Sequence, residues 1–585
     1  MSPPFDVAIL GSGFAGSLLG LLLRKRGLSV LVIDRQKHPR FAIGESSTPA
    51  ADFILESLCD EYDLPELRPL CRYGSWCRSQ PSISRGLKRG FSYFHHREGE
   101  PYTPGPNHEA ELLVAASAND EVGDTHWYRA DVDAFIAQLF VEAGGELWEE
   151  TTVESIQAKG IRSMAVSHRI RPLSPTIDAA FEIDSAVGER AGVRGLERES
   201  WPAHPNPLPR NVSTCGADVA RGGEGAENRQ LTNSPIPEGP IWRLECQRQG
   251  AITRVEARFL VDGTGGDSAL VRTLGLASEV DSLSTHSRSL FGHFHGVRHW
   301  GDLLAQSGVD RTDHPYPCDQ AALHHIIDGG WMWMLRFDNG ITSVGWSLDP
   351  RRHPVPANLS PEEEWQLLLS RYPSIAEQLR NALPALPFTI EKPVARTGRM
   401  QRLVSQAAGA NWALLPHTAG FIDPFYSTGI AQSLLGVESL AAILSQVRSL
   451  EDRTAELERY SHRLKREIVQ IDHFVSLAYQ TMGRDPRLLH AASMLYFAAA
   501  TTFETRRKAG IHDEFLLADD EEFRQVVQQL HSTCPQGSES VDDWVRSVQT
   551  LTRPWNTVGL FEPLRPNMYW HTAAPKGALG QQASG

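Results

Sequence analysis

Gly11-Ser12-Gly13-Phe14-Ala15-Gly16 separates an apolar segment, Asp6 to Leu10, from the leucine-rich segment Ser17 to Arg26. The first segment has the pattern of a buried strand, and the second that of a helix that ends at Gly27. Leu28 to Ile33 then predicts a second strand. A strand, a glycine turn, a helix and another strand form a βαβ unit, so the sequence predicts an α/β fold with a parallel sheet.

The glycine turn has the G-x-G-x-x-G spacing of a dinucleotide-binding site. Its first glycine permits a tight turn, its second lets the backbone approach a pyrophosphate, and its third lets helix and strand pack closely. The free N–H groups of the helix favour phosphate, and an acid at the end of the second strand is suited to a ribose. A turn without a ligand would not need all these features in register. The predicted binding residues are Gly11, Gly13, Phe14, Ala15, Gly16 and Asp34.

Composition excludes several other classes of protein. The formal net charge of −14 over 585 residues argues against nucleic-acid binding, which needs clustered basic residues. The seven cysteines have no metal-ligand spacing, so we expect no metal site. Asp6 leads directly into the first strand without a secretory signal, and the run Leu18 to Leu23 is too short to span a bilayer. We therefore expect a soluble cytoplasmic protein without an integral membrane segment.

One long segment differs from the rest of the chain. Residues 161–239 contain proline-rich and glycine-rich runs, including Trp201 to Pro209 and Arg221 to Gly225. Such a composition buries too little apolar area to offset the entropy of ordering, which favours a disordered insertion over a lid. After Asp423 the pattern becomes helical, beginning with Gly429 to Val447.

Two later segments resemble parts of FAD-binding proteins. Leu260 to Gly265 is similar to their third strand near the dinucleotide, which assigns Asp262 and Gly263 to the cofactor site. Gly420-Phe421-Ile422-Asp423-Pro424 resembles the distal flavin motif, in which the aspartate binds the ribityl chain. The resemblance therefore implies FAD as the cofactor, with Asp423 among its ligands.

Three further segments carry a more specific resemblance. Phe41 to Pro49 follows His38-Pro39-Arg40, Gly86 to Tyr93 has the form G-x-K-x-G-F-S-[FY], and Leu415 to Gly429 forms a continuous loop motif. Together they closely resemble flavin-dependent halogenases, especially those that act on phenols. The resemblance covers most of residues 1–450 apart from the insertion. It implies that four residues lie near the flavin: Arg40, Glu45, Ser46 and Arg129. The alternative for Glu45 is that it only holds the loop, and the alternative for Arg129 is an ion-paired structural role.

The chemistry of that family gives the remaining motifs a role. Reduced FAD and oxygen form a peroxide that chloride or bromide attacks, which yields hypohalous acid. The halide needs an anion site beside the flavin, and the backbone N–H groups of Thr428 and Gly429 are suitable donors. A lysine then delivers the halogen to the ring, and Lys88 matches it as an ammonium donor or as an amine. Without the resemblance, Lys88 would be read as a solvated surface lysine.

Two positions depart from the family pattern. The family motif W-x-W-x-I-P is thought to hold substrate away from the flavin. Both of its tryptophans are present here as Trp331 and Trp333, but Leu335-Arg336 stands in place of Ile-Pro. Alternation in an ordinary core strand would also place both tryptophans on one face. The glutamate that precedes the halide loop in tryptophan halogenases is Tyr426 here, as in phenol and pyrrole types. Phenols need a general base, which the sequence does not identify.

The resemblance implies an FAD-binding Rossmann-like domain interleaved with a β-sheet substrate domain, of the flavin monooxygenase type, followed by a helical C-terminal cap. We expect a small aromatic substrate and a separate flavin reductase, because no second dinucleotide motif is found. The alternatives are a monooxygenase or a geranylgeranyl-reductase-like enzyme and a non-catalytic flavoprotein. The expected boundaries are 1–70, 125–290 and 391–450 for the FAD-binding domain, 71–124 and 291–390 for the substrate domain, and 451–585 for the cap.

Overall fold

The computed structural model describes residues 3–159, 236, 241–312, 314–385, 393–537, 540–561 and 568–569. All of them belong to one compact unit. The expected disordered insertion, 161–239, lies outside the described residues except for residue 236. No helix in the described part of the chain is both long enough and apolar enough to cross a membrane.

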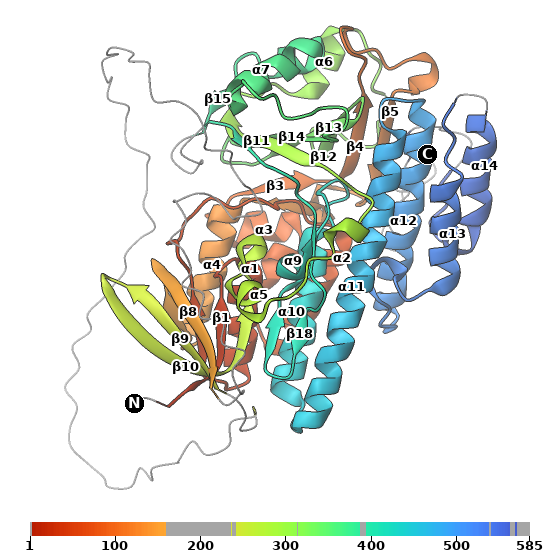
Figure 1. Ribbon diagram of the computed structural model, residues 1–585. Helices are drawn as coiled ribbons and strands as arrows, with labels where there is room; N and C mark the ends of the chain where they lie inside the picture. Colours follow the sequence, from red (N-terminus) through yellow and green to blue (C-terminus); the bar gives the residue numbers. More distant parts are fainter. Residues whose placement is uncertain are drawn as a thin grey trace, which may run out of the picture. The chain divides into compact units, whose positions relative to one another are not determined.

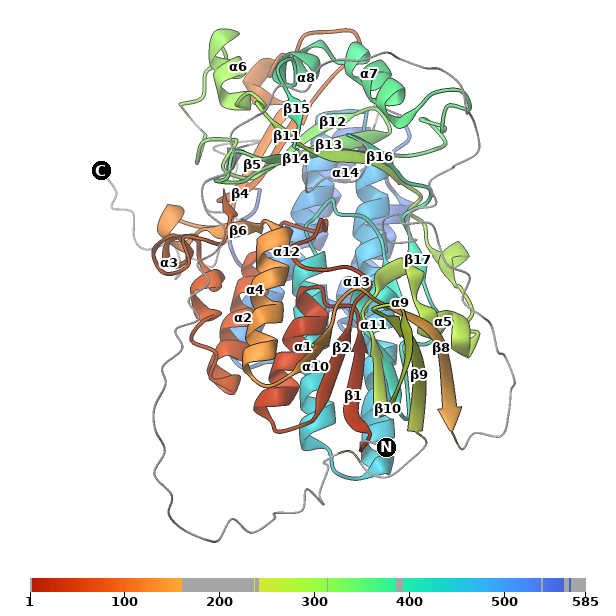
Figure 2. The same cartoon turned by 90° about the vertical axis from the view of Figure 1, so that its left-hand side faces the viewer.

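The first sheet carries the predicted βαβ unit (Figures 1 and 2). Its parallel strands run in the order β19-β10-β1-β2-β7, and β18, β9 and β8 extend it by antiparallel pairing. Buried apolar residues fill these strands because helices cover the sheet. The bounds are β1 Phe5–Leu10, β2 Val30–Ile33, β7 Glu146–Trp148, β8 Thr151–Lys159, β9 Ile241–Arg248, β10 Ala251–Asp262, β18 Ala408–Gly409 and β19 Trp412–Leu414.

Helices pack around this sheet. The leucine-rich α1 contacts α4 and α10. Gly20 of α1 leaves room for the ring of Phe140 in α4, because a Cβ on Gly20 would lie only 3.0 Å from that ring. α10 also contacts α2 and α11. The bounds are α1 Phe14–Lys25, α2 Pro49–Tyr62, α3 Tyr73–Ser79, α4 Arg129–Glu142, α5 Ala269–Leu274, α9 Pro416–Ala419 and α10 Gly429–Gln446.

A second, mostly antiparallel sheet has the strand order β15-β11-β14-β13-β12-β4-β5-β21, with β16 beside β11. Alternate residues of β13 enter different cores: Met332 and Met334 pack in the cluster that includes α6, α7 and α8, whereas Trp331 and Trp333 join the cluster shared with the first sheet. The bounds are β4 Gly90–His95, β5 Glu111–Ala115, β11 Arg288–His295, β12 Ala322–Ile327, β13 Gly330–Arg336, β14 Thr342–Leu348, β15 Leu383–Pro384, β16 Ala395–Arg396, β21 Met568–Tyr569, α6 Trp300–Gln306, α7 Pro361–Arg371 and α8 Pro373–Gln378.

Long helices complete the fold (blue in Figure 1). α12 is central among them, because it contacts α11 and α14 as well as α2. Two short ladders, β3 with β6 and β17 with β20, join the larger elements. The bounds are α11 Leu450–Thr481, α12 Pro486–Lys508, α13 Glu521–Ser532, α14 Val541–Leu551, β3 Arg85–Lys88, β6 Asp124–Trp127, β17 Arg402–Leu403 and β20 Gly420–Phe421.

The α/β fold with a Rossmann-like domain, a sheet domain and C-terminal helices is confirmed. Element ends differ from the sequence prediction by a few residues. The domain boundaries remain predictions. Of the second sheet, β4 and β5 lie in residues 71–124 and β12 to β14 in residues 291–390, whereas β11 begins before residue 291.

Candidate active site

The glycine turn meets the steric demands of its motif. Gly11 has a φ of 93°, and a Cβ on it would lie 2.7 Å from the carbonyl oxygen of Gly263. A Cβ on Gly16 would lie 2.0 Å from the carbonyl oxygen of Gly11, so helix and turn require a glycine there. The space beside Gly13 is different, because the nearest atoms to a Cβ there are guanidinium nitrogens of Arg40 at 3.6 Å and Arg129 at 3.7 Å. Backbone and cations together form a cradle for a pyrophosphate.

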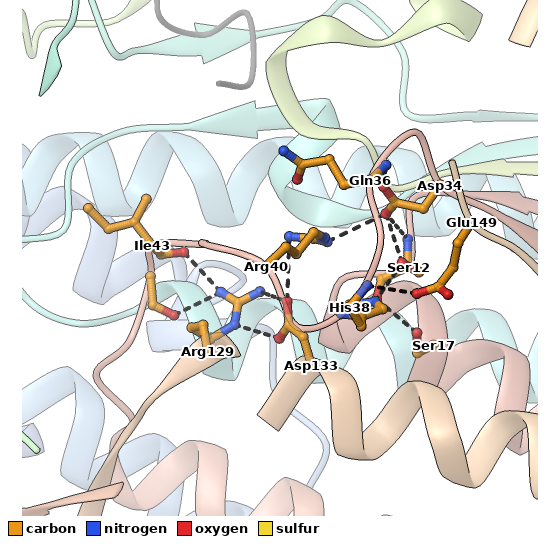
Figure 3. A network of polar contacts seen from close by, with 11 residues as sticks. Ser12, Ser17, Asp34, Gln36, His38, Arg40, Ile43, Arg129, Asp133 and Glu149 are labelled. Atoms are coloured by element: carbon orange, nitrogen blue, oxygen red, sulfur yellow. Dashed lines mark hydrogen bonds and ion pairs between the residues drawn. The ribbon is translucent and has the colours of Figure 1, made fainter. Parts of the chain in front are cut away.

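Asp34 lies directly after β2, at the same edge of the sheet as the glycine turn (Figure 3). Its Oδ2 accepts hydrogen bonds from the backbone N–H and the hydroxyl of Ser12, both at 2.8 Å, and its Oδ1 accepts from the N–H of Gln36 at 2.8 Å. Burial alone would raise the pKa of Asp34, but the Arg40 guanidinium and these hydrogen bonds lower it below its usual value. Asp34 is therefore an anionic acceptor at the edge where a ribose would bind.

A row of alternating charges leads from Asp34 towards the segment 41–49 (Figure 3). Arg40 lies 3.5 Å from Asp34 and 3.9 Å from Asp133. Arg129 binds Asp133 through two hydrogen bonds of 2.7 and 2.9 Å and donates to the carbonyl oxygens of Ile43 and Gly44 at 2.9 and 3.0 Å. Arg129 thus has the ion-paired, loop-holding geometry, and its guanidinium still borders Gly13. Both roles considered for it from the sequence fit this position.

The segment 41–49 meets the start of α10. Ser427, which has a φ of 55°, donates a hydrogen bond of 3.1 Å to the hydroxyl of Ser46. Thr428 and Gly429 follow as the N-cap and the first residue of α10, whose first N–H groups have no partner within the helix. No side chain of the described residues caps this end. The partial positive charge of an 18-residue helix is therefore available to an anion beside the loop that carries Glu45.

Glu45 is buried and pairs with His293 through an Oε1–Nε2 contact of 2.8 Å. Its backbone carbonyl accepts from the N–H of Trp127 at 2.6 Å, and the ring of Phe41 packs on His293 at 4.9 Å. Its second oxygen, Oε2, has no hydrogen-bond partner among the described residues. A buried, unpartnered carboxylate oxygen is costly without a ligand, which is consistent with Glu45 both holding its loop and facing a cofactor.

The two other aspartates assigned to the cofactor bind within the protein. Asp262 organises the turn after β10, where it accepts from the N–H and hydroxyl of Thr264 and from the hydroxyl of Ser268. Asp423 accepts hydroxyl hydrogen bonds from Ser287, Ser347 and Tyr479 at 2.6, 2.7 and 3.0 Å. It therefore lies in a polar cluster between the second sheet and α11, and the structure does not bring it to the glycine turn.

His417 is a site residue that the sequence prediction missed. It lies in α9, directly after β19, at the edge where the parallel strands end and where ligands bind in such sheets. Its Nδ1 contacts the hydroxyl of Ser433 in α10 at 3.0 Å. Burial away from water lowers the pKa of His417, and the positive charges of Arg402 and Arg129 lower it as well, so the ring is neutral. Its position one residue after Pro416, at the end of an apolar strand, was the signal available in the sequence.

Lys88, the predicted catalytic lysine, is fully buried at the end of β3. Its Nζ donates to the carbonyl oxygen of Ser47 at 2.5 Å and lies 4.1 Å from the centre of the Phe91 ring. Burial lowers the pKa of Lys88 to about 8, although the negative charges around it act in the opposite direction. The alternative of a solvated surface lysine is therefore excluded, and Lys88 has the environment of a reactive amine.

Three carboxyl groups from different elements surround Lys88. Asp124 is its cross-strand partner in β6, Asp52 comes from α2, and Glu504 comes from α12; all are buried. Burial raises the pKa of Asp124 to about 6, even though Lys88 acts to lower it. The pKa values of Asp52 and Glu504 are raised well above those of ordinary carboxyl groups, first by burial and then by the charge of Asp124. The sequence prediction missed this group, because no local pattern connects residues so far apart.

Comparisons with known proteins agree with this geometry. A family model described as tryptophan halogenase matches residues 237–491, and one described as NAD(P)-binding Rossmann-like domain matches residues 9–55. Tetracycline 7-halogenase of Kitasatospora aureofaciens is 28% identical over 80% of this chain and 68% of its own length. Monodechloroaminopyrrolnitrin halogenase PrnC of Pseudomonas fluorescens is 28% identical over 88% of this chain and 75% of its own.

The chain is thus similar over most of its length to the flavin-dependent halogenase family. The solved structure of halogenase PltM in complex with phloroglucinol and FAD has the same fold, with a TM-score of 0.69 at 22% identity over 94% of this chain and 96% of that one. Members of this family are FAD-dependent enzymes, and the expected FAD cofactor is therefore confirmed at the level of the family.

The departure from the family's tryptophan motif has a structural explanation in this chain. Trp331 and Trp333 lie on one face of β13, and their rings are 5.7 Å apart. Trp333 fits because Gly345 faces it, since a Cβ there would lie 2.2 Å from its ring. Arg336, in place of proline, ends the strand by bonding to Asp319 at 3.1 Å and to the carbonyl oxygen of Val297 at 3.0 Å. The changed pair therefore fixes the strand end and leaves both tryptophans in position.

The histidine pairs of this chain are part of its core. His96 and His325 contact each other at 2.9 Å, whereas His95 faces His490 and His324 packs between aromatic rings. Within the described residues, no group of three or more potential ligands is arranged to hold a metal ion. The contacts of these histidines are therefore with each other and with neighbouring aromatic rings.

Proposed function

We propose that this chain is a halogenase of electron-rich aromatic compounds, phenols above all, which uses reduced FAD, oxygen and chloride or bromide. The observation that carries this proposal is the state of Lys88: a fully buried lysine with a pKa of about 8 beside an aromatic ring and three buried carboxyl groups. Such a lysine has no stabilising surface role, and a perturbed pKa of this kind is typical of a functional group.

The residues near the glycine turn fit FAD. Gly13, Arg40 and Arg129 would hold the pyrophosphate, and Asp34 would accept a ribose hydroxyl. Glu45 Oε2, buried without a partner, is available to the flavin end of the cofactor. When bound and reduced, FAD supplies the two electrons that activate oxygen. The protein contributes the cradle and a water-poor environment for this chemistry.

The halide would bind at the start of α10. Backbone N–H groups of Thr428 and Gly429 attract an anion through direct hydrogen bonds and the partial charge of the helix end. The Ser427–Ser46 hydrogen bond joins this site to the loop carrying Glu45, so halide and flavin sites are parts of one constellation. The neutral side chain of Tyr426 at the position before Ser427 adds no competing negative charge.

Lys88 would transfer the halogen as a neutral amine. Its Nζ takes electrophilic halogen from hypohalous acid, so that an N–X bond forms while the X–O bond breaks, and the ring then attacks the halogen. Burial favours the amine, and it also prevents water from competing for the reactive halogen. The aromatic face of Phe91 and the nearby aromatic residues of α12 form a suitable environment for a substrate ring.

The reduced cofactor would come from a separate flavin reductase. The glycine motif at residues 11–16 is accounted for by FAD, and the sequence has no second G-x-G-x-x-G between a strand and a helix. Relatives named for their substrates act on different aromatic compounds: tetracycline in one, and pyrrole-2-carbonyl groups on a peptidyl carrier protein in another. The phloroglucinol bound to PltM favours a free phenol here.

The test is turnover with the purified protein, FAD, an NADH-driven flavin reductase, oxygen, bromide or chloride, and a panel of phenols and resorcinols. We expect monohalogenated products with the isotope pattern of bromine or chlorine, formed only when halide and reductase are present. A hydroxylated product that forms equally well without halide would instead identify a monooxygenase, the alternative that the altered tryptophan motif raises.

A further inference from the structure

A small cavity of about 20 Å³ lies where α12 packs against the start of α2 and the strand β4. This volume holds about one water molecule, so a substrate ring requires the wall to move. Glu504 supplies the cavity's only carboxyl group among otherwise apolar, aromatic and hydroxyl side chains. The lining residues are Thr48, Pro49, Ala50, Phe91, Ala116, Tyr496, Phe497, Ala500, Thr501, Glu504, Phe515 and Leu516.

One wall of the cavity has a strained backbone. Leu516 and Leu517 both lie in the left-handed region, with φ values of 53° and 60°. A branched residue rarely adopts this conformation, which costs free energy and is found most often at ligand sites and moving segments. The wall formed by Phe515 and Leu516 is therefore the part of the cavity best suited to move when a ring enters.

Glu504 faces this cavity with an unused acceptor. Its side chain is 3% exposed, and its Oε2 has no hydrogen-bond partner among the described residues. Buried polar atoms in native proteins almost always have a partner, so this oxygen needs an explanation. The N–H of Ala50 is directed at the same carboxyl group. The charged and titratable groups that face Glu504 are Asp124 of β6, Lys88 of β3, Lys508 and Tyr496 of its own helix, and, beyond Asp124, Asp52 of α2.

The cavity adjoins Lys88. Phe91 lines it, and the Lys88 Nζ lies 4.1 Å from the centre of that ring. Lys88 is not itself a lining residue, so a substrate ring reaches its amine when the Phe91 side chain also turns aside. The ring would then have the amine of Lys88 on one side and the carboxyl group of Glu504 on another. Burial, followed by the charge of Asp124, raises the pKa of Glu504 well above that of an ordinary carboxyl group. The charge of Lys508 and the N–H of Ala50 act in the opposite direction and favour the carboxylate, which once formed is a stronger base than an ordinary carboxylate.

We propose that Glu504 is the general base that accepts the hydroxyl proton of a phenolic substrate bound beside Lys88, an inference that rests on the proposed halogenase function. The phenolic O–H bond breaks, its proton goes to the Glu504 carboxylate, and the ring carbon attacks the halogen. The C–X bond forms as the N–X bond to Lys88 breaks. The ring C–H proton then leaves to Lys88, and Glu504 returns its proton to the ring oxygen. Hypohalous acid supplied by the halogenase reaction is thereby converted to water overall.

The test compares Glu504→Gln, which keeps the shape and removes the base, with the wild-type enzyme on a phenol and on its methyl ether. We expect the variant to lose activity on the phenol by a factor of about 100 or more, the usual contribution of a general base. Activity on the ether should not fall, because it has no hydroxyl proton to remove and because loss of the Glu504 charge favours the neutral amine of Lys88. The phenol activity of the variant should also keep rising above pH 8 towards the phenol's own ionisation near pH 10.

Glu111→Gln is the matched control, since Glu111 is a fully buried carboxyl group on β5 that bonds to Tyr102 and two histidines. It should keep the preference for phenol. FAD retention and trapping of hypohalous acid by a thiol report whether Glu504→Gln is intact. A variant that is intact but loses phenol and ether activity equally, or that keeps full phenol activity, overturns the role of Glu504. A wild-type enzyme that halogenates no phenol refutes the proposed function instead.

Discussion

Raising the pH from 6 to 8 should accelerate halogen transfer, because the account requires Lys88 as a neutral amine. Burial holds the pKa of Lys88 at about 8. The amine then makes up about 1% of this lysine at pH 6, about 9% at pH 7 and about 50% at pH 8. The rate should therefore rise nearly tenfold over the first pH unit and about fivefold over the second, and level off above pH 8. An ordinary lysine would contain roughly 300-fold less amine at pH 7.

The assay is a rapid-quench measurement of product from one turnover, with an aryl methyl ether as substrate so that no hydroxyl proton contributes to the pH dependence. A thiol trap measures hypohalous acid in parallel, which separates the flavin chemistry from halogen transfer. Lys88→Arg keeps the positive charge but stays protonated at every pH, and Lys88→Met removes the charge. Both variants should form hypohalous acid without aryl halide. A rate that falls above pH 8, or activity retained in Lys88→Arg, would refute the amine mechanism and indicate an ammonium donor.

Three further changes test other parts of the site. Gly13→Ala should leave the melting temperature of the FAD-free protein unchanged but weaken FAD binding at least tenfold, as followed by flavin fluorescence, because its Cβ would be 3.6 Å or more from any protein atom yet would obstruct the pyrophosphate. Gly16→Ala should instead lower the stability by about 1–3 kcal/mol or more in urea unfolding, since its Cβ would lie 2.0 Å from a carbonyl oxygen. Gly429→Pro should leave α10 folded, because proline is tolerated at the first position of a helix. It removes one N–H donor and should therefore raise the KM for bromide about tenfold, whereas Gly429→Ala keeps the donor and should leave this KM unchanged. Asp124→Asn should lower the pKa of Lys88 below about 8, because the carboxylate stabilises the ammonium. The rise of the pH–rate profile should then move to lower pH, and an unshifted profile would show that the two groups do not interact.

The sequence predicted the parts of the site that depend on local pattern. The glycine turn and Asp34 are defined by neighbours within a few residues, and the steric demands at Gly11 and Gly16 explain why the motif can be recognised in the sequence. Trp331 and Trp333 share a face because side chains alternate along a strand. The family resemblance then supplied the role of Lys88, which the pattern of charges alone would have placed on the surface.

The rest of the site depends on contacts between distant segments. Glu504 reaches Lys88 from α12, more than 400 residues along the chain, and Asp52 arrives from α2. Asp423 matches a motif, but its carboxylate is bonded to Ser287, Ser347 and Tyr479, partners that no local pattern reveals. Burial and pKa values follow from such tertiary packing, so the general base could be proposed only once the helices had been placed against the sheet.

The central claim is that halogen reaches the substrate through Lys88. Its most direct test is mass spectrometry of reactions that contain FAD, a flavin reductase, oxygen, bromide and a phenol, run in parallel with the wild-type enzyme and with Lys88→Met at equal FAD occupancy. The account predicts a brominated phenol from the wild-type enzyme alone and equal trapping of hypobromous acid by both. Brominated phenol formed by the variant at the wild-type rate would contradict it.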